Sequence, residues 1–147
     1  MTAYQRENVL QFIKILKDNF ELSHNEQDTV DYLERILSSG QVIMRFDENE
    51  QLILFLDYWR LEKLIDKDEK PYPKEFSKGP VLYVNTFWIA SEWEGKGLNW
   101  WALRELLSRN EDAKYLAWNH EKRSDRFFMK KLPSVYHRSY AANHRNC

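Results

Sequence analysis

The sequence predicts an α/β (α+β) fold, in which helices flank a mixed but mostly antiparallel central sheet. Two N-terminal segments repeat apolar residues at helical spacing, and the next two alternate as a strand hairpin. A long apolar strand then runs through a glycine-containing loop into a third helix. A chain of 147 residues that is 43% hydrophobic can bury its own core, so one domain is expected over residues 1–147.

Two helices are predicted before the first strand. The first covers about residues 4–18, where Val9, Leu10, Ile13 and Leu16 recur at helical spacing that continues to Phe20 just beyond its end. The second begins at Ser23, which forms a capping-box pattern with Glu26, and Gly40 follows its end. The side chains expected to be buried in this second helix are Val30, Leu33, Ile36 and Leu37.

A hairpin and a long connection follow these helices. Residues 41–47 and 51–59 are predicted to pair as antiparallel strands. Residues 60–78 are charged and contain two prolines, which indicates a surface connection of unusual length. Asp57 and Glu62 flank this connection, and each is either an acceptor for an amine proton or a solvated charge.

The remaining elements complete the order α-α-β-β-β-α-β-α. Residues 81–90 are apolar on both faces and therefore form a central strand. After a polar loop come a helix (98–108), a strand (113–119) and a helix (124–132) that Ser124 caps and Pro133 ends. Residues 133–147 are left as a basic tail or one short strand.

Charge and cysteine usage restrict the setting of the protein. The net charge of −1 is uneven, because residues 120–147 hold seven Lys or Arg against two Asp or Glu. This basic end predicts either an anionic ligand or a solvated tail. The one cysteine, Cys147, cannot form an internal disulfide, which favours a cytoplasmic location. No apolar run reaches the roughly 20 residues of a membrane span, and no zinc-site spacing occurs, so neither a membrane nor a metal is expected.

The loop between the central strand and the third helix is the candidate anion site. The first N–H groups of a helix have no internal partner, and the helix dipole favours negative charge there. Gly95 and Gly97 let a ligand approach the backbone closely, and Lys96 adds a positive charge. The loop is therefore either a phosphate cradle or a simple tight turn.

Residues 41–132 resemble the GNAT superfamily of N-acetyltransferases in element order and in two motifs. The family loop pattern Gln/Arg-x-x-Gly-x-Gly/Ala matches residues 92–97, Glu-Trp-Glu-Gly-Lys-Gly. The family also often has an Asn after the next strand and then a phrase similar to Ala-x-x-Phe-Tyr-x-Lys-Leu. Asn119 and residues 124–132 stand in those places. A more distant likeness to toxin-activating lysine acyltransferases lies in residues 86–91, Thr-Phe-Trp-Ile-Ala-Ser, and indicates shared fold rather than shared activity.

The resemblance implies an N-acyltransferase that uses acetyl-CoA or another acyl-CoA as co-substrate. Its implied cofactor-binding residues are Trp88, Ile89, Gly95, Lys96, Gly97, Leu98, Asn119 and Phe128. The strand 86–89 would splay from its neighbour 114–118 and receive the pantetheine arm, while the N–H of Trp88 or Ile89 polarises the acyl carbonyl. The candidate proton-transfer residues are Tyr136, His137 and His120. The acceptor is an amine of a small molecule or a protein.

Other features favour a non-catalytic GNAT-like protein that serves binding or assembly. Glu92 and Glu94 place two carboxylates beside the presumed pyrophosphate, and Phe128 stands where the family has its general-acid Tyr. Trp100 and Trp101 point about 100° apart on one helix, so one of them is expected to be partly exposed and to serve a protein partner or a homodimer. Binding of nucleic acid by the basic tail is a third alternative, without a known motif.

Overall fold

The computed structural model describes residues 1–19, 25–62, 79–120 and 123–132. In these ranges the elements are α1 (Ala3–Asn19), α2 (Glu26–Ser39), β1 (Val42–Phe46), β2 (Leu52–Leu61), β3 (Val81–Ile89), the 3-10 turn η1 (Ser91–Trp93), α3 (Leu98–Arg109), β4 (Tyr115–His120) and β5 (Arg123–Lys131). The strands of this described part form one sheet in the order β1-β2-β3-β4-β5. Neighbouring strands are antiparallel except for the parallel pair β3–β4, so the predicted mixed, mostly antiparallel sheet is confirmed.

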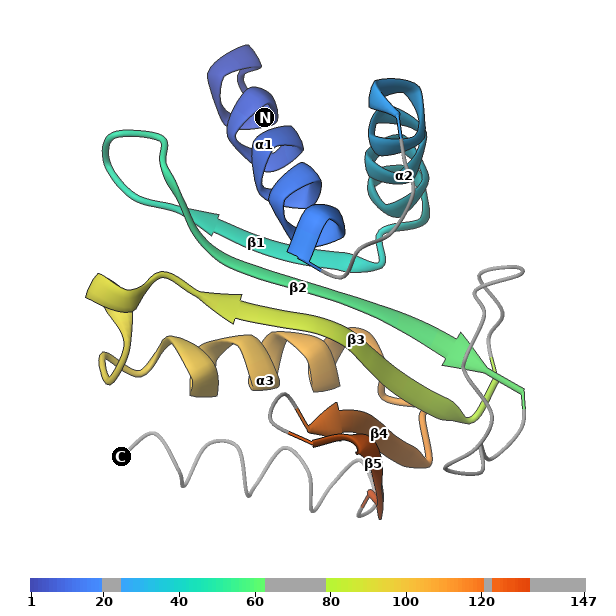
Figure 1. Cartoon of the computed structure of the whole chain (residues 1–147). Coiled ribbons are helices and arrows are strands. Elements are labelled where there is room, and N and C mark those ends of the chain that lie inside the picture. The colour runs from blue at the N-terminus through green and yellow to red at the C-terminus, as the bar shows by residue number, and fades with distance from the viewer. Residues whose placement is uncertain (20–24, 63–78, 121–122, 133–147) are drawn as a thin grey trace.

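Helices cover both faces of the sheet (Figure 1). α1 and α2 pack on one face through a buried cluster that includes Val9, Leu33 and Phe55. α3 packs on the other face through a second cluster that includes Leu54 and Leu106. Successive residues of β2 point to opposite faces, so this strand supplies side chains to both clusters and is buried over nearly its whole length.

The caps of α2 differ partly from the prediction. The N-cap is Asn25, whose side chain accepts from the N–H of Asp28, while the Asp28 carboxylate accepts from the Asn25 N–H. This capping box begins two residues after the predicted cap Ser23, which lies outside the described residues. The C-cap is Gly40 at φ 70°, as predicted, because a left-handed residue closes the helix there without strain.

β3 is the central strand, as its apolar sequence predicts. Its register with β2 shifts at one point: Asp57 faces Thr86, whereas the next β2 residue, Tyr58, faces Val84. Asn85 is therefore the extra residue of a β-bulge, a device that breaks the ladder locally and re-aims a side chain. The bulge lies halfway along β3, directly after Val84, the last β3 residue that pairs with β4.

The last described element contradicts the prediction of a helix over residues 124–132. These residues belong to β5, which runs antiparallel to β4 with Phe128 opposite Trp118. Without β5, the outer edge of β4 would expose a row of unpaired backbone groups, and pairing satisfies them. The aromatic pair Phe127 and Phe128 also suits a strand as well as a helix. The predicted tail, residues 133–147, lies outside the described residues.

Candidate functional site

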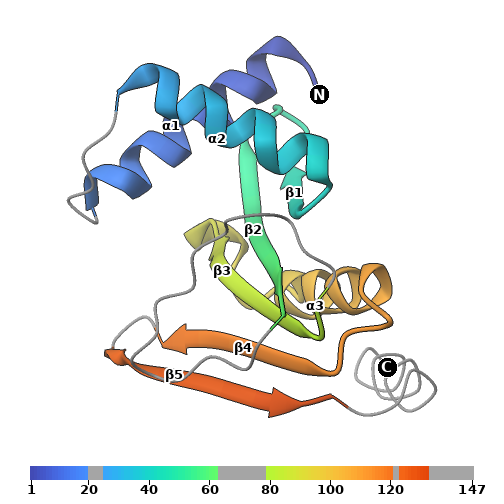
Figure 2. The ribbon, with the colours of Figure 1, turned by 90° about the vertical axis from the view of Figure 1, so that its right-hand side faces the viewer.

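The parallel strands β3 and β4 are paired over only part of their length. The register runs from Val81 opposite Tyr115 to Val84 opposite Trp118 and then stops. Residues 85–89 of β3 continue without a partner on β4, and Figure 2 shows the two strands starting side by side and then diverging. We call this opening the splay. It opens toward the carboxyl ends of the two strands, where ligands of α/β proteins commonly bind.

Backbone donors of β3 point into the splay. The N–H of Ala90 donates to the Ile53 carbonyl of β2 at 2.9 Å. Successive residues of an antiparallel strand direct their N–H groups to alternate edges, so the N–H of Ile89 points away from β2 and toward the open edge. The splay therefore offers a main-chain donor at Ile89, one of the two positions that the sequence predicts to polarise a carbonyl.

The glycine loop begins α3 beside this opening. Gly95 and Gly97 have φ values of 74° and 85°, which only glycine adopts freely, and a Cβ added to either would meet no atom within 4 Å. Gly97 is the N-cap of α3 and supplies no side-chain hydrogen bond to the helix N-terminus. No acidic residue lies in the first turn of α3. The start of α3 is therefore free of a side-chain cap and of acidic residues in its first turn, and the first N–H groups of a helix are the donors of an anion site.

The charged side chains of the loop are exposed. Glu92 and Glu94 both face solvent, so neither is forced toward the start of α3. The Lys96 ammonium lies 5.1 Å from the centroid of the Trp93 ring, a cation–π distance. Of the adjacent tryptophans, Trp100 is 37% exposed and Trp101 packs against the α3-side core, which confirms that one of the two is partly exposed.

Asp57 is the buried polar group at the level of the splay. Its carboxylate is fully buried in the middle of β2, on the face that α1 and α2 cover. Oδ2 accepts hydrogen bonds from the Tyr32 hydroxyl of α2 and, at 3.0 Å, from Nδ2 of the bulged residue Asn85. Among the described residues Oδ1 has no hydrogen bond of normal geometry. The structure therefore rules out a solvated charge for Asp57, whereas Glu62 is exposed.

The environment of Asp57 alters two pKa values. Burial raises the pKa of the Asp57 carboxyl from 3.8 to about 6, although nearby donors from Asn85 and Thr86 oppose the rise. Burial, together with the charge of Asp57, raises the pKa of Tyr83 to about 12. The folded chain therefore favours the neutral form of the Asp57 carboxyl more than the unfolded chain does.

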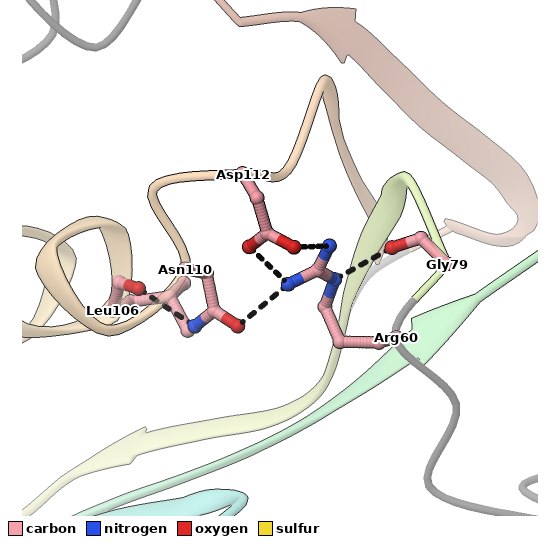
Figure 3. A network of polar contacts seen from close by, with 5 residues as sticks. All are labelled: Arg60, Gly79, Leu106, Asn110 and Asp112. Atoms are coloured by element: carbon pink, nitrogen blue, oxygen red, sulfur yellow. Dashed lines mark hydrogen bonds and ion pairs between the residues drawn. The ribbon is translucent and has the colours of Figure 1, made fainter.

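A second polar network lies at the opposite, paired end of β3 (Figure 3). Arg60 is buried and donates through Nε to the Gly79 carbonyl at 2.7 Å. Its Nη1 and Nη2 donate to the two carboxylate oxygens of Asp112 at 2.9 and 3.2 Å, and Nη1 also reaches Asn110 Oδ1 at 3.3 Å. We call this network the Arg60 brace. It joins the end of β2 to the residues just before β3 and to the turn between α3 and β4.

Comparison with known proteins identifies the fold. No protein-family model and no curated protein sequence matches this chain.

Solved structures do match. An aminoglycoside antibiotic 6'-N-acetyltransferase from Acinetobacter haemolyticus has a TM-score of 0.56 at 13% identity, over 99% of this chain and 85% of that one. An acetyltransferase of the GNAT family from Staphylococcus aureus has a TM-score of 0.54 at 10% identity, over 98% and 79%. A predicted acetyltransferase from Clostridium acetobutylicum, crystallised with acetyl-CoA, has a TM-score of 0.52 at 12% identity, over 83% and 79%. The chain has a divergent GNAT-like fold.

The GNAT-like fold brings together only some of the residues that the sequence singled out. Trp88 and Ile89 at the end of β3 are continuous with the loop that holds Gly95, Lys96, Gly97 and Leu98. Asn119 and His120 lie at the end of β4, on the other arm of the splay. Phe128 lies in β5, so β4 separates its strand from β3, and its predicted cofactor contact stays a prediction. Tyr136 and His137 lie outside the described residues.

The sequence left open whether Asp57 is a solvated charge, and the structure shows that it is buried. A signal was present, because Asp57 is the one acidic residue in the strand Leu-Ile-Leu-Phe-Leu-Asp-Tyr-Trp-Arg-Leu, which is otherwise mostly apolar. A charge in such a strand is either paired or functional, since burying a carboxylate costs free energy.

The GNAT-like fold also has a cleft of about 450 Å³ between α1 and the start of α2. Its lining residues are Glu7, Leu10, Gln11, Lys14, Asn25, Glu26, Thr29 and Val30. The lining includes no residue of β3, of the glycine loop or of the Asp57 cluster, so the splay is the better candidate for chemistry.

The described residues contain no group of three or more His, Cys, Asp or Glu that could hold a metal ion. None of their helices is long and apolar enough to cross a bilayer.

Proposed function

We propose that this protein is an acyl-CoA-dependent N-acyltransferase that acylates an amine of a small molecule or a protein. The observation that carries the proposal is the splay of β3 and β4 directly before a glycine-lined helix N-terminus. The fold neighbours are described as acetyltransferases, and one of them was crystallised with acetyl-CoA, which supports the same class of co-substrate here.

The residues present fit such a co-substrate. The backbone N–H groups of residues 95–98 lie at the start of α3, where a pyrophosphate would be held, and Gly95 and Gly97 place no side chain in its way. The unpaired segment 86–89 would bind the pantetheine arm as a neighbouring strand would, through its main-chain groups. The N–H of Ile89 would then polarise the acyl carbonyl and stabilise negative charge on its oxygen as the amine attacks.

Proton transfer needs one group to receive a proton from the amine and one to protonate the thiolate that leaves. His120, at the end of β4, is a candidate from its place on one arm of the splay. Tyr136 and His137 remain candidates from the sequence. Asn119 and Phe128 stay in the proposal as co-substrate contacts.

The lone cysteine continues to favour a cytoplasmic setting, and a single domain over residues 1–147 remains our expectation.

A second candidate function is a non-catalytic GNAT-like scaffold for protein binding. Exposed Glu92 and Glu94 beside the start of α3 favour it, because carboxylates within about 5 Å of a pyrophosphate oppose binding by roughly 1 kcal/mol each. Partly exposed Trp100 on the same helix supplies a side chain typical of protein interfaces.

Calorimetric titration with acetyl-CoA separates the two functions. The proposal predicts binding to the wild-type chain and at least about 100-fold weaker binding to Gly97→Glu, whose carboxylate enters the open space at the N-terminus of α3. Gly40→Glu is the matched control, because Gly40 also has a positive φ with open space around it but caps α2 instead. The control should lose stability and keep acetyl-CoA affinity.

Two outcomes would contradict the proposal. If the folded wild-type chain binds no acetyl-CoA at high micromolar concentration, the scaffold function takes its place. If Gly97→Glu and Gly40→Glu bind as tightly as the wild type does, acetyl-CoA is held elsewhere on the molecule.

A further inference from the structure

β1 lies at the edge of the sheet and is paired on one side only. The sheet order gives β1 one neighbour, β2, and no described strand pairs with its other edge. The N–H of Tyr58 donates to the Gln41 carbonyl at 3.1 Å, so these two residues form a hydrogen-bonded pair of the antiparallel ladder. Hydrogen-bonded and non-hydrogen-bonded pairs alternate along such a ladder. The N–H and C=O groups of Val42 and Met44 therefore point away from β2.

Contacts at the two ends of β1 agree with this direction of its main-chain groups. Nη1 of Arg109, on α3, donates to the Val42 carbonyl at 3.0 Å, as is possible for a carbonyl that β2 does not use. Beyond the other end, the N–H of Asp47 donates to the Gln51 carbonyl at 2.9 Å. The main-chain groups of the preceding residue, Phe46, therefore also point outward.

The outward groups of Met44 and Phe46 leave this edge able to accept a further strand. No hydrogen bond from another described residue reaches them. Edge strands usually prevent such pairing with charged side chains or proline. β1 contains no proline, and its one charged residue, Arg45, has its guanidinium carbon 4.7 Å from the centroid of the Trp101 ring on α3.

The strand at the opposite edge of the sheet, β5, is much richer in charge. Its charged residues are Arg123, Asp125, Arg126, Lys130 and Lys131. Charges along an edge strand oppose strand addition, so β1 is the less protected of the two outer strands.

We infer that β1 pairs antiparallel with β1 of a second copy of this chain, about a two-fold axis at Met44. The two sheets then join into one continuous sheet. In this register Val42 lies opposite Phe46 of the partner subunit, and both side chains lie on the sheet face that α1 and α2 cover. Arg109 occupies one lone pair of the Val42 carbonyl, and the second accepts from the N–H of Phe46 of the partner subunit. A two-fold interface of this kind uses the same residues on both copies and closes on itself.

Charge complementarity favours a second copy over an unrelated strand. The turn after β1, residues 47–51, contains no Lys or Arg, and its carboxylates are those of Asp47, Glu48 and Glu50. Arg109 lies at the other end of the β1 edge, beside Val42, and its side chain is 43% exposed. Antiparallel pairing brings the acidic turn of each copy to Arg109 of the other, so the attraction acts twice. The exposed ion pair of Arg109 with Glu105, at 3.6 Å, competes only weakly.

Sedimentation velocity over a range of concentrations tests this dimer. A strand of five residues with two turn contacts makes a small interface, so the dissociation constant should lie between about 10 and 100 μM. The chain should therefore sediment as a monomer at about 1 μM and mostly as a dimer at about 500 μM. Dimerisation of this kind does not depend on acyl transfer, so the measurement needs no co-substrate.

Proline substitutions test which side of β1 forms the contact. Met44→Pro removes an N–H that points away from β2, so the chain keeps its ladder hydrogen bonds while the dissociation constant rises at least about 10-fold. Arg45→Pro is the matched control, because the N–H of Arg45 points to Leu54 of β2. This control should lower the free energy of unfolding, measured with urea, by more than Met44→Pro does.

Charge reversal gives a second test that does not depend on proline. Glu48→Arg and Arg109→Glu should each weaken the dimer about 10-fold, because two like-charge contacts replace two attractive ones. The double variant should recover most of the wild-type affinity, since opposite charges again meet across the two-fold axis. Loss of a purely structural contact would not be rescued in this way. These variants decide the matter even if Met44→Pro does not fold.

A folded wild-type chain that stays monomeric at about 500 μM would overturn the inference. A dimer that folded Met44→Pro leaves unchanged would overturn it too, as would a double charge variant that dimerises no more tightly than either single one. Trp100→Ala should leave the dimer intact, because the partly exposed Trp100 lies on α3 and not on the β1 edge. If this variant dissociates the dimer, the second copy binds through α3 and the inference is wrong.

Discussion

The two halves of β3 differ in their pairing and in their burial. Residues 81–84 are paired on both sides, to β2 and β4, and three of the four are buried. Residues 86–89 are paired only to β2, and Asn85 is the bulge residue. All five residues are partly or largely exposed, although four of them carry large or β-branched side chains suited to a strand. The first half of β3 therefore joins β2 and β4 into one sheet, whereas the second half leaves its β4-side edge unpaired.

The two buried charged residues of β2, which lie beside the two halves of β3, differ in their hydrogen bonding. At the paired end Arg60 is buried with hydrogen bonds to Gly79, Asn110 and Asp112, so its charge is compensated. At the open end Asp57 is buried with a raised pKa and an oxygen that lacks a regular hydrogen bond. The buried charge is therefore compensated by hydrogen bonds at the paired end, whereas at the open end the burial of Asp57 lowers stability.

The largest expected effect comes from breaking the paired end. Arg60→Ala removes the brace, with its hydrogen bonds to the Gly79 carbonyl and the Asn110 amide oxygen and its ion pair with Asp112, so the free energy of unfolding should fall by about 3 kcal/mol. Urea unfolding measures it. Arg109→Ala is the control, because Arg109 is more exposed and donates to one carbonyl, that of Val42, and its loss should cost about 1 kcal/mol. Equal losses in the two variants would mean that the brace has no special role.

A smaller effect of opposite sign is expected at the open end. The pKa of Asp57 is higher in the folded chain than in the unfolded one, so its contribution to stability is complete below about pH 3.8 and is lost as the pH rises through about 6. At pH 8 the ionised carboxylate therefore destabilises the fold. Asp57→Asn should raise the free energy of unfolding by about 2 kcal/mol at pH 8, with no gain at pH 4.

Urea unfolding at the two pH values checks this sign. A loss of stability at pH 8 would show that Asp57 is a structural anion, and the contrast between the two ends of β3 would then disappear.

The elements with strong local signals were predictable. Helical spacing located α1 and α2, alternation located the β1–β2 hairpin, and Gly40 marked the end of α2 by its need for positive φ. These features depend on residues within a few positions of one another, so a single sequence contains the information.

The remaining features depend on contacts between distant segments. Residues 123–131 form a strand because β4 offers them an unpaired edge, and Ser124 and Pro133 suggested helix ends that this pairing overrides. The hydrogen bonds of Asp57 likewise come from distant segments, since Tyr32 and Asn85 lie 25 and 28 positions away. The Arg60 brace likewise joins residues as many as 52 positions apart.

Amide hydrogen exchange along β3 tests most directly the claim that this strand is closed at one end and open at the other. In the free chain the amides of residues 81–84 should exchange at least about 100-fold more slowly than those of Phe87 and Ile89, whose N–H groups point to the edge that β4 leaves uncovered. Addition of acetyl-CoA should slow Ile89. If Phe87 and Ile89 are as protected as Leu82 in the free chain, β3 and β4 are paired throughout, and no slot for an acyl-CoA exists.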